Sequence, residues 1–416
     1  MSRWPIAPLG SVVRFISGGT PSKDEKRFWD GDIPWVSSAE MTQRWTSDTR
    51  LKVTEAGAIE GSKRVPKNTV LVVVRGMSLA KEFRVSISQR DVTFNQDVKA
   101  ALPSKGIDPV FLFFYLLSQS NAIRDSASEA AHGTKKLDMP VLEQWPIPVP
   151  PIATQNKIAA ILSAYDDLIA NNQRRITLLE RMAEDIYREW FVRLRFPGHQ
   201  GGKLEQGLPQ GWRAAAIGEV FKTASGGIPS RTEAANFGGE IPWIKTGELK
   251  TTFAIGSEET VTQQGIENSA AKVYKKYTVI MAMYCAMPDL SIIANDAATN
   301  QACCAFSPRN AKFHHSYCYF LIKFAQLQLV MFAHGAAQQN LSQEIIKKFP
   351  VLLPSEDLVV AFGMKVGPIF DSMEALMRAN LQLKATRDAL LPRLISGKLA
   401  VDALDICFPP GMSPSA

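Results

Sequence analysis

Ser17-Gly18-Gly19-Thr20-Pro21-Ser22 and Gly31-Asp32-Ile33-Pro34-Trp35-Val36 are two motifs that the 416-residue chain contains twice. Their second copies are Ser225-Gly226-Gly227-Ile228-Pro229-Ser230 and Gly239-Glu240-Ile241-Pro242-Trp243-Ile244. Ser225 lies 208 residues after Ser17, and Trp243 lies 208 residues after Trp35. Solenoids and propellers repeat at about 20 to 50 residues, so this much longer period indicates a duplicated domain.

The composition excludes several classes of protein. No uninterrupted apolar run approaches the ~20 residues that span a bilayer, and the first five residues lack the apolar core of a signal peptide. We therefore expect a cytoplasmic protein with no membrane partner. The five cysteines show no paired spacing, which fits a reducing compartment. Neither they nor His314-His315 have the spacing of metal ligands, so no metal site is expected.

The net charge of +7 is concentrated in the two repeated regions. Residues 1–145 carry 20 Lys and Arg against 16 Asp and Glu, and residues 200–349 carry 14 against 11. The rest of the chain is neutral overall. A modest basic excess is compatible with binding a polyanion such as DNA.

Each half begins with a lobe of mixed structure. Short runs rich in β-branched residues, such as residues 69–74 and 277–283, predict strands in the middle of each lobe. An apolar helix is expected later in each lobe, at residues 110–120 and 316–332. A proline-bounded connector then follows, and its fixed φ angles predict an extended, stiff segment.

A long helix follows each connector. Apolar residues recur at spacings of three and four from Ile158 to Ile186 and again from Val359 to Leu394, which is typical of a coiled-coil seam. Gly367-Pro368 predicts a kink in the second helix, and Pro392 predicts a kink or its end. Since two apolar stripes in one chain need cover, we expect the helices to pair antiparallel. The residues that we expect along this seam are Leu168, Asn172, Leu179, Leu376, Asn380 and Leu383.

Asn172 and Asn380 occupy matching positions of the two predicted seams. A buried asparagine there fixes the register of a coiled coil at some expense of stability. The alternative is that each one faces solvent in a looser bundle, and the sequence leaves both open.

The expected fold class is α+β, with two mixed α/β lobes separated by a long antiparallel two-helix coiled coil in a pseudo-two-fold repeat. The expected segments are a first lobe at 1–150, a proximal helix at 151–196, a linker and second lobe at 197–350, a distal helix at 351–400, and a C-terminal tail at 401–416.

The two lobes differ inside their shared frame. Residues 40–94 and 248–299 have almost no sequence in common. The offset between copies falls to 205 at Asn95 and Asn300 and to 202 at His132 and His334. A preserved frame with divergent contents indicates two copies that recognise different targets.

Catalytic motifs are almost entirely missing. The chain has no GxxxxGK[ST] loop, no GxGxxG after a strand, no GxSxG elbow, and no Asn-Pro-Pro-Tyr loop of the kind that holds a flipped base. Two acid-x-Lys fragments, at 97–99 and 248–250, lack the upstream aspartate of a nuclease site. We therefore expect a non-catalytic protein that binds no cofactor itself.

Polar loops are the better candidates for function. Lysine and arginine neutralise phosphates, glycine allows close backbone approach, and glutamine and asparagine pair with adenine edges. The same residues would also suit ordinary solvated loops. Trp35 and Trp243 occupy duplicated apolar positions and are expected in the core rather than stacked on bases. The candidate DNA-binding residues are Lys23, Lys26, Arg27, Lys135, Lys136, Arg231, Gln338, Gln339 and Asn340.

These motifs resemble the specificity subunit of type I restriction–modification systems. The resemblance covers nearly the whole chain, in family order. Ile228 in place of Thr20 and the altered late loop of the second lobe are departures that concern which bases are read. The matching stretches are residues 9–35, 133–155, 179–191 and 387–397.

The resemblance implies a DNA reader in which each lobe, a target recognition domain, recognises half of a split asymmetric target. It implies that the helices set the spacing and dock two modification subunits, which use S-adenosylmethionine to methylate adenines. Restriction subunits that use ATP and Mg would add translocation and cleavage. Two alternatives from other classes are a stand-alone DNA methyltransferase or nuclease with duplicated domains, and a protein-interaction scaffold.

Overall fold

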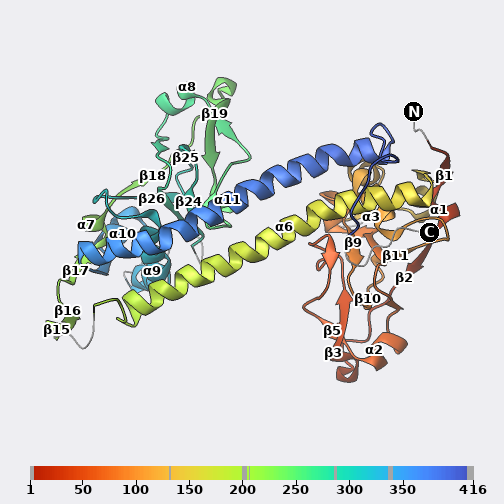
Figure 1. Cartoon of the computed structure of the whole chain (residues 1–416), viewed down its shortest axis with the longest axis horizontal. Helices are drawn as coiled ribbons and strands as arrows, with labels where there is room; N and C mark the ends of the chain where they lie inside the picture. The colour runs from red at the N-terminus through yellow and green to blue at the C-terminus, as the bar shows by residue number, and fades with distance from the viewer. Residues whose placement is uncertain are drawn as a thin grey trace. The chain divides into compact units, whose positions relative to one another are not determined.

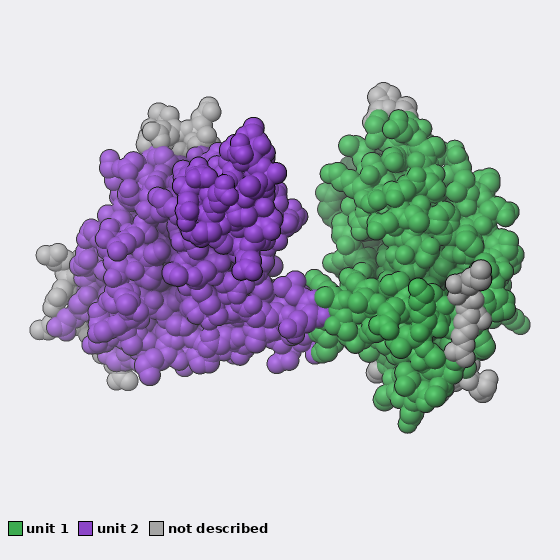
Figure 2. Space-filling view, turned by 90° about the horizontal axis from the view of Figure 1, so that it is seen from above, with its two compact units in different colours: residues 1–169, 383–416 green, residues 170–382 purple. Residues whose placement is uncertain are grey.

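The computed structural model describes residues 4–130, 133–198, 204–205, 207–284, 288–335 and 341–409. The chain forms two compact units, residues 1–169 with 383–416 and residues 170–382 (Figure 2). Figure 1 shows two long helices, α6 (Ile152–Tyr187) and α11 (Glu356–Ile395). Each of them contributes residues to both units. None of the helices in the described part of the chain is both long and apolar enough to cross a membrane.

The lobe of the first unit is built on a five-stranded sheet. Its neighbouring strands are antiparallel except for the last pair, which is parallel. Helix α3 (Pro109–Ser118) packs on this sheet, and Asp108 caps it by accepting a hydrogen bond of 2.8 Å from the amide of Phe111. The strands, in spatial order, are β2 (Val13–Ser17), β11 (Val98–Pro103), β7 (Val70–Val73), β9 (Val85–Ser88) and β4 (Trp45–Thr46).

Smaller elements complete this lobe. A four-stranded sheet contains β5 (Lys52–Val53), β3 (Trp29–Val36), β10 (Val92–Phe94) and β6 (Arg64–Val65), with α2 (Glu55–Glu60) beside it. A three-stranded sheet contains β12 (Ser128–Glu129), β13 (Lys135–Lys136) and β8 (Arg75–Gly76). The remaining elements are β1 (Ile6–Pro8) paired with β14 (Pro146–Pro148), α1 (Leu9–Val12), α4 (Ser120–Asp125), α5 (Met139–Glu143), and the 3-10 helices η1 (Lys26–Phe28) and η2 (Met77–Ala80).

The lobe of the second unit repeats this topology. Its five-stranded sheet has the order β18 (Phe221–Ser225), β26 (Cys303–Pro308), β23 (Val279–Ala282), β24 (Leu290–Ile293) and β20 (Phe253–Ala254), again with a parallel last pair. Its four-stranded sheet has the order β21 (Thr260–Val261), β19 (Phe237–Ile244), β25 (Ala297–Thr299) and β22 (Val273–Tyr274). The remaining elements are β15 (Leu204–Glu205) with β16 (Leu208–Pro209), β17 (Arg213–Ala216) with β27 (Pro350–Leu353), α7 (Ile217–Val220), α8 (Gln263–Glu267), α9 (His315–Gly335), α10 (Gln343–Lys348), and the 3-10 helices η5 (Ala234–Asn236) and η6 (Thr246–Glu248).

The late parts of the two lobes can be compared only in part. The first lobe has the three-stranded sheet β12-β13-β8, and the positions that match β13 in the second lobe, 337 and 338, lie outside the described residues. Helix α9 has 21 residues, whereas α3 has 10. The preserved five-stranded and four-stranded sheets confirm a duplicated domain.

The two long helices pair antiparallel within each unit. In the second unit Asn172 contacts Asn380, and Tyr187, fifteen residues further along α6, contacts Phe362 with ring centroids 5.8 Å apart. In the first unit Asp166 contacts Arg387, while Thr154 donates a 2.7 Å hydrogen bond to Asp402. In both units, residues later in α6 therefore contact residues earlier in the partner segment, as in an antiparallel pair.

The expected seam is wrong at Leu168. Leu168 is 45% exposed, whereas Leu162, Asp166, Ile176 and Ala183 are buried. The sequence pattern favoured the larger apolar residues, but the buried line passes through a charged residue and an alanine. Leu179, Leu376 and Leu383 are half-buried.

The asparagines of the seam are buried and bonded to each other. Asn172 and Asn380 are 4% and 6% exposed, and the Asn172 amide donates a 3.0 Å hydrogen bond to the Asn380 side-chain oxygen. The two residues are counterparts in the repeat, so the helices meet here with a local two-fold relation. This excludes the alternative that both face solvent.

The helix ends differ from expectation. Helix α11 continues through Gly367-Pro368 and past Pro392 to Ile395, so Pro392 does not end it, and Gly397 follows with a φ of +75°. At Gly363 an added Cβ would lie 2.7 Å from Cβ of His314, which explains a glycine inside this helix. Helix α6 passes into a π-helical turn, Arg188–Val192, before the chain leaves it.

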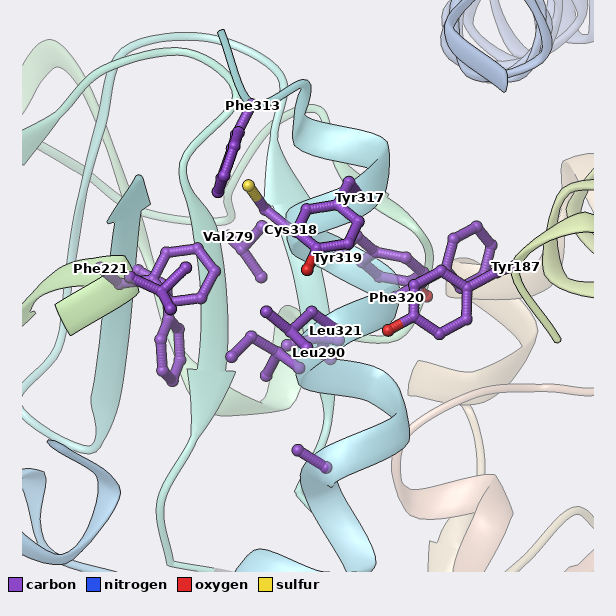
Figure 3. Packing of buried hydrophobic residues seen from close by; sticks show 14 of the residues in the cluster. Tyr187, Phe221, Val279, Leu290, Phe313, Tyr317, Cys318, Tyr319, Phe320 and Leu321 are labelled. Carbon is purple, nitrogen blue, oxygen red and sulfur yellow. The ribbon is translucent and has the colours of Figure 1, made fainter. Parts of the chain in front are cut away.

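Aromatic residues hold the end of α6 to the second lobe. Tyr187 lies 5.4 Å from Phe320 of α9 between ring centroids, and both are buried beside Tyr317 (Figure 3). Phe221, Val279 and Leu290 extend this core across the five-stranded sheet.

Candidate nucleic-acid interface

The repeated Ser-Gly-Gly motif packs closely against the backbone of its own lobe. An added Cβ on Gly18 would lie 2.0 Å from the carbonyl oxygen of Phe94, and one on Gly226 would lie 2.2 Å from that of Thr299. These glycines therefore allow close approach of the lobe's own backbone.

The tryptophans of the second motif belong to the same structure. Nε1 of Trp35 donates to the carbonyl of Gly19 at 3.1 Å, and Nε1 of Trp243 donates to that of Gly227 at 3.0 Å. Trp35 is 6% and Trp243 is 2% exposed, which confirms that both are core residues. The repeated motifs thus build the frame and leave recognition to other residues.

The basic residues after the Gly-Gly turn fall into two groups. Lys23 and Lys26 are exposed, and their side chains have no ion pair with any residue of the described part. Arg27 is paired with Glu60 through contacts of 3.2 and 2.8 Å and with Glu25 at 2.7 Å. The hydrogen bonds that Arg27 donates to Glu25 and then to Glu60 raise the pKa of Arg27. Arg27 is therefore held within its lobe.

Arg231 of the second lobe is also engaged. It pairs with Glu259 at 2.9 Å, and its guanidinium lies 5.5 Å from the ring centre of Trp243. Arg27 and Arg231 stabilise the frame at equivalent ends of the two lobes. They are poorer candidates for phosphate contact than the two lysines, because a carboxylate already neutralises each of them.

The late loop of the first lobe is ordered as a strand. Lys135 and Lys136 form β13, opposite Gly76 and Arg75 respectively. Lys136 also pairs with Asp138 at 2.7 Å. The corresponding candidates of the second lobe, Gln338, Gln339 and Asn340, lie outside the described residues.

A buried polar network joins the first lobe to the helix pair. The Asp166 side chain of α6 is 5% exposed and pairs with the Arg387 side chain of α11, which is 7% exposed. Nε1 of Trp45 donates to Asp166 at 3.1 Å, and Arg44 lies 3.5 Å from the same carboxylate. Burial, then repulsion from Arg387, lowers the pKa of Arg44, and attraction to Asp166 opposes this. Sequence reasoning missed this network, although a charged residue inside an apolar seam was the available signal.

The second lobe is attached to α11 by different residues. Glu374 is the repeat counterpart of Asp166, with a side chain that is 8% exposed. It pairs with Lys276 of the lobe at 3.3 Å and with Arg378 at 2.7 Å. Burial favours a higher pKa for Glu374, but the hydrogen bonds from Arg378 and Lys276 lower it. Each lobe thus has its own ionic attachment to the helices.

The buried thiols and imidazoles are unsuited to chemistry. Burial raises the pKa of Cys303, Cys304 and Cys318 to about 12, so these thiols stay protonated. Burial, with His314 and Lys276 nearby, lowers the pKa of His315 to about 3. Across the residues that the structure describes, no group of three His, Cys, Asp or Glu is placed to hold a metal ion. Among the candidate residues, Lys23 and Lys26 of the first lobe are exposed lysines of the kind that contact the phosphates of a nucleic acid.

Comparison with known proteins agrees with a role in nucleic-acid binding. The model of the type I restriction modification DNA specificity domain matches residues 1–181 and 209–366, so the chain belongs to this family and carries the domain twice. The family confirms the expected fold class, two mixed α/β lobes with a long antiparallel helix pair in a pseudo-two-fold repeat. It also assigns the chain a role in DNA sequence specificity as a non-catalytic component.

Individual relatives match either nearly the whole chain or one part of it. The MjaIX specificity subunit of Methanocaldococcus jannaschii is 26% identical over 416 residues, covering 96% of this chain and 94% of that protein. The EcoR124I/EcoR124II specificity subunit of Escherichia coli is 32% identical over 162 residues, covering 38% and 40%. The crystal structure of an S subunit from M. genitalium covers 94% of this chain and 96% of its own with a TM-score of 0.61, and at 18% identity it shows a shared fold.

Proposed function

We propose that each lobe reads one half of a bipartite, asymmetric site in double-stranded DNA. The observation that carries this is the pair of five-stranded sheets with equivalent strand order, which enclose sequences with almost nothing in common, residues 40–94 and 248–299. Two copies that bound one target twice would keep the same surface. These two keep the same core and change the surface.

The long helices act as a ruler between the half-sites. With 36 residues, α6 is about 54 Å long at ~1.5 Å per residue. Half-sites on one face of DNA recur about every 34 Å, so a helix of this length suits a reader of two separated grooves. The buried asparagine pair holds the register of the helices and thereby the length of the ruler.

The chain acts in the cytoplasm with partners that perform the chemistry. Two modification subunits dock on the helices and supply S-adenosylmethionine, and restriction subunits supply the ATP- and Mg-dependent steps. This chain contributes DNA contacts, among them Lys23 and Lys26 as phosphate ligands. Methylation requires the target base to leave the duplex, which is the task of a modification subunit.

The decisive experiment exchanges one lobe. Residues 1–145 are replaced by the lobe of another family member, and methyladenine is mapped across the genome of a host that lacks other adenine methylation. One half of the methylated motif should change, while the other half and the spacer persist. A change in both halves, or in neither, contradicts the proposal.

A heptad inserted into each long helix provides the matched control. It adds about 10 Å, so the spacer should lengthen by about three base pairs with both half-sites unchanged. Methylation or cleavage by the purified chain alone would instead indicate a stand-alone enzyme. A reconstituted complex with no salt-dependent DNA binding would indicate a protein scaffold.

A further inference from the structure

The three-stranded sheet β12-β13-β8 of the first lobe presents a row of exposed polar side chains, in which the Ser128 hydroxyl donates a 3.1 Å hydrogen bond to the carbonyl of Lys136. Ser128 lies opposite Lys136, and Lys136 lies opposite Arg75, so the three side chains share one face of the sheet. All three are exposed. The sheet is fixed to the core of the lobe, because the amide of Leu137 donates a 2.8 Å hydrogen bond to the carbonyl of Val74, directly after β7.

Stability does not account for this row. Like charges directly opposite each other on neighbouring strands are destabilising, and Arg75 faces Lys136. Asp138 neutralises Lys136 at 2.7 Å, but no described residue forms an ion pair or hydrogen bond with the Arg75 side chain. An unpaired guanidinium on an exposed strand is suited to an external partner with acceptor groups.

The backbone beside Arg75 is equally specialised. Gly76 has a φ of +131° and a ψ of 176°, a conformation that only glycine adopts readily. It turns the chain into η2, where Leu79 is fully buried and Met77 is 73% exposed. A short helix anchored by one leucine thus holds an apolar side chain out into solvent next to Arg75.

The second lobe has a different residue at the same place. Arg75 lies two residues after the end of β7, and Tyr284 lies two residues after the end of the equivalent strand β23. Tyr284 is 54% exposed. The same position of a shared frame therefore offers a guanidinium in one lobe and a phenol in the other.

We propose that the face formed by Ser128, Lys136, Arg75 and the adjoining Met77 is the base-reading surface of the first lobe, and that Arg75 reads a guanine. The guanidinium can donate two parallel hydrogen bonds to O6 and N7 of guanine in the major groove, the geometry that distinguishes this base. Lys136 then contacts phosphate, and Met77 contacts an apolar base edge. Tyr284 takes the place of Arg75 for the other half-site. This inference rests on the proposed reading of one half-site by each lobe.

The test maps methyladenine with the full chain produced together with its modification subunit in a host free of other adenine methylation. Arg75→Ala should relax one G·C position in the half-site assigned to the first lobe by the lobe exchange. Its complex should bind the wild-type site about 5- to 150-fold more weakly. Tyr284→Ala should alter only the other half-site. Arg75 is exposed, and an unchanged melting temperature of the complex confirms that the variant folds.

Two matched variants separate reading from general attraction. Lys23→Ala should weaken binding to every DNA sequence, reduce the salt slope by about 0.9, and leave the motif unchanged. Lys105→Ala lies after β11, at the opposite end of the five-stranded sheet from Arg75, and should leave both affinity and motif unchanged. An Arg75→Ala motif identical to that of the wild type would overturn the inference. Failure of the wild-type complex to methylate any bipartite motif would overturn the proposed function instead.

Discussion

The contact between Asp166 and Arg387 offers a quantitative test of how the first lobe is held on the helix pair. The Asp166 carboxylate accepts a 3.1 Å hydrogen bond from the indole of Trp45 and forms ion pairs with Arg387 and, at 3.5 Å, with Arg44. Asp166 and Arg387 are each 6% exposed. We compare Asp166→Leu, Arg387→Met and the double variant.

The two single variants should lose different amounts of unfolding free energy. Asp166→Leu leaves Arg387 and Arg44 facing each other without the carboxylate between them, and Arg387 keeps only Asp388, which is 54% exposed. Removing one partner of a buried ion pair destabilises a protein by about 3 to 5 kcal/mol. Arg387→Met leaves Asp166 with both Trp45 and Arg44, so we expect a loss of about 1.5 to 3 kcal/mol, the range for one charged hydrogen bond.

The double variant should be no less stable than Asp166→Leu alone, because it removes the unpaired Arg387 together with its partner. The coupling energy between the two sites is then at least about 1.5 kcal/mol, within the range measured for residues that touch. Hydrogen exchange followed by mass spectrometry gives the opening free energy of peptides from residues 152–169 and 383–395 in the full chain. Asp185→Asn, an exposed aspartate on the same helix, is the control. Additive losses, or a larger loss for Arg387→Met than for Asp166→Leu, would refute the reasoning.

Two further predictions concern the second unit. Asn172→Leu removes the 3.0 Å hydrogen bond to buried Asn380 and should destabilise this unit by about 1 to 3 kcal/mol. The double variant Asn172→Leu with Asn380→Leu should recover most of this loss in thermal melts. A double variant that is less stable than both single variants would contradict this prediction. His315 is neutral in the folded unit with its pKa lowered to about 3, against about 6.5 when unfolded, so its contribution to stability is complete above pH 6.5 and declines as the pH falls towards 3. Between pH 7 and pH 5 the free energy of unfolding should fall by about 2 kcal/mol through this group. His315→Phe should remove that part of the pH dependence while its ring still stacks on Tyr277. Equal pH dependence of the wild type and the variant in urea unfolding would count against this prediction.

Much of the fold was predictable because it depends on local pattern. The repeated motifs predicted the duplication, and the matching sheet orders confirm it. The late apolar helices were expected at 110–120 and 316–332 and are α3 and α9. The burial of Trp35 and Trp243 followed from their duplicated apolar surroundings.

The candidate site was less predictable because its residues are brought together across long stretches of chain. The sequence pattern predicted Arg27 as a phosphate ligand, but in the folded lobe Arg27 pairs with Glu60, which lies 33 residues away in the chain. Arg231 meets Glu259 across 28 residues in the same way. No sequence motif marks Arg75 as a DNA-binding candidate, because its position beside Lys136 depends on strand β13 pairing with β8.

The sequence by itself determined that this protein has two copies of one domain, a pair of long helices, and no catalytic motif. Those properties depend on spacing and residue type, which are read along the chain. Only the tertiary structure decided that the Ser-Gly-Gly motif packs against its own lobe, that the seam passes through Asp166 and not Leu168, and which cations remain unpaired. The reason is physical: hydrogen bonds and ion pairs depend on distances of about 3 Å between side chains, and folding alone sets those distances.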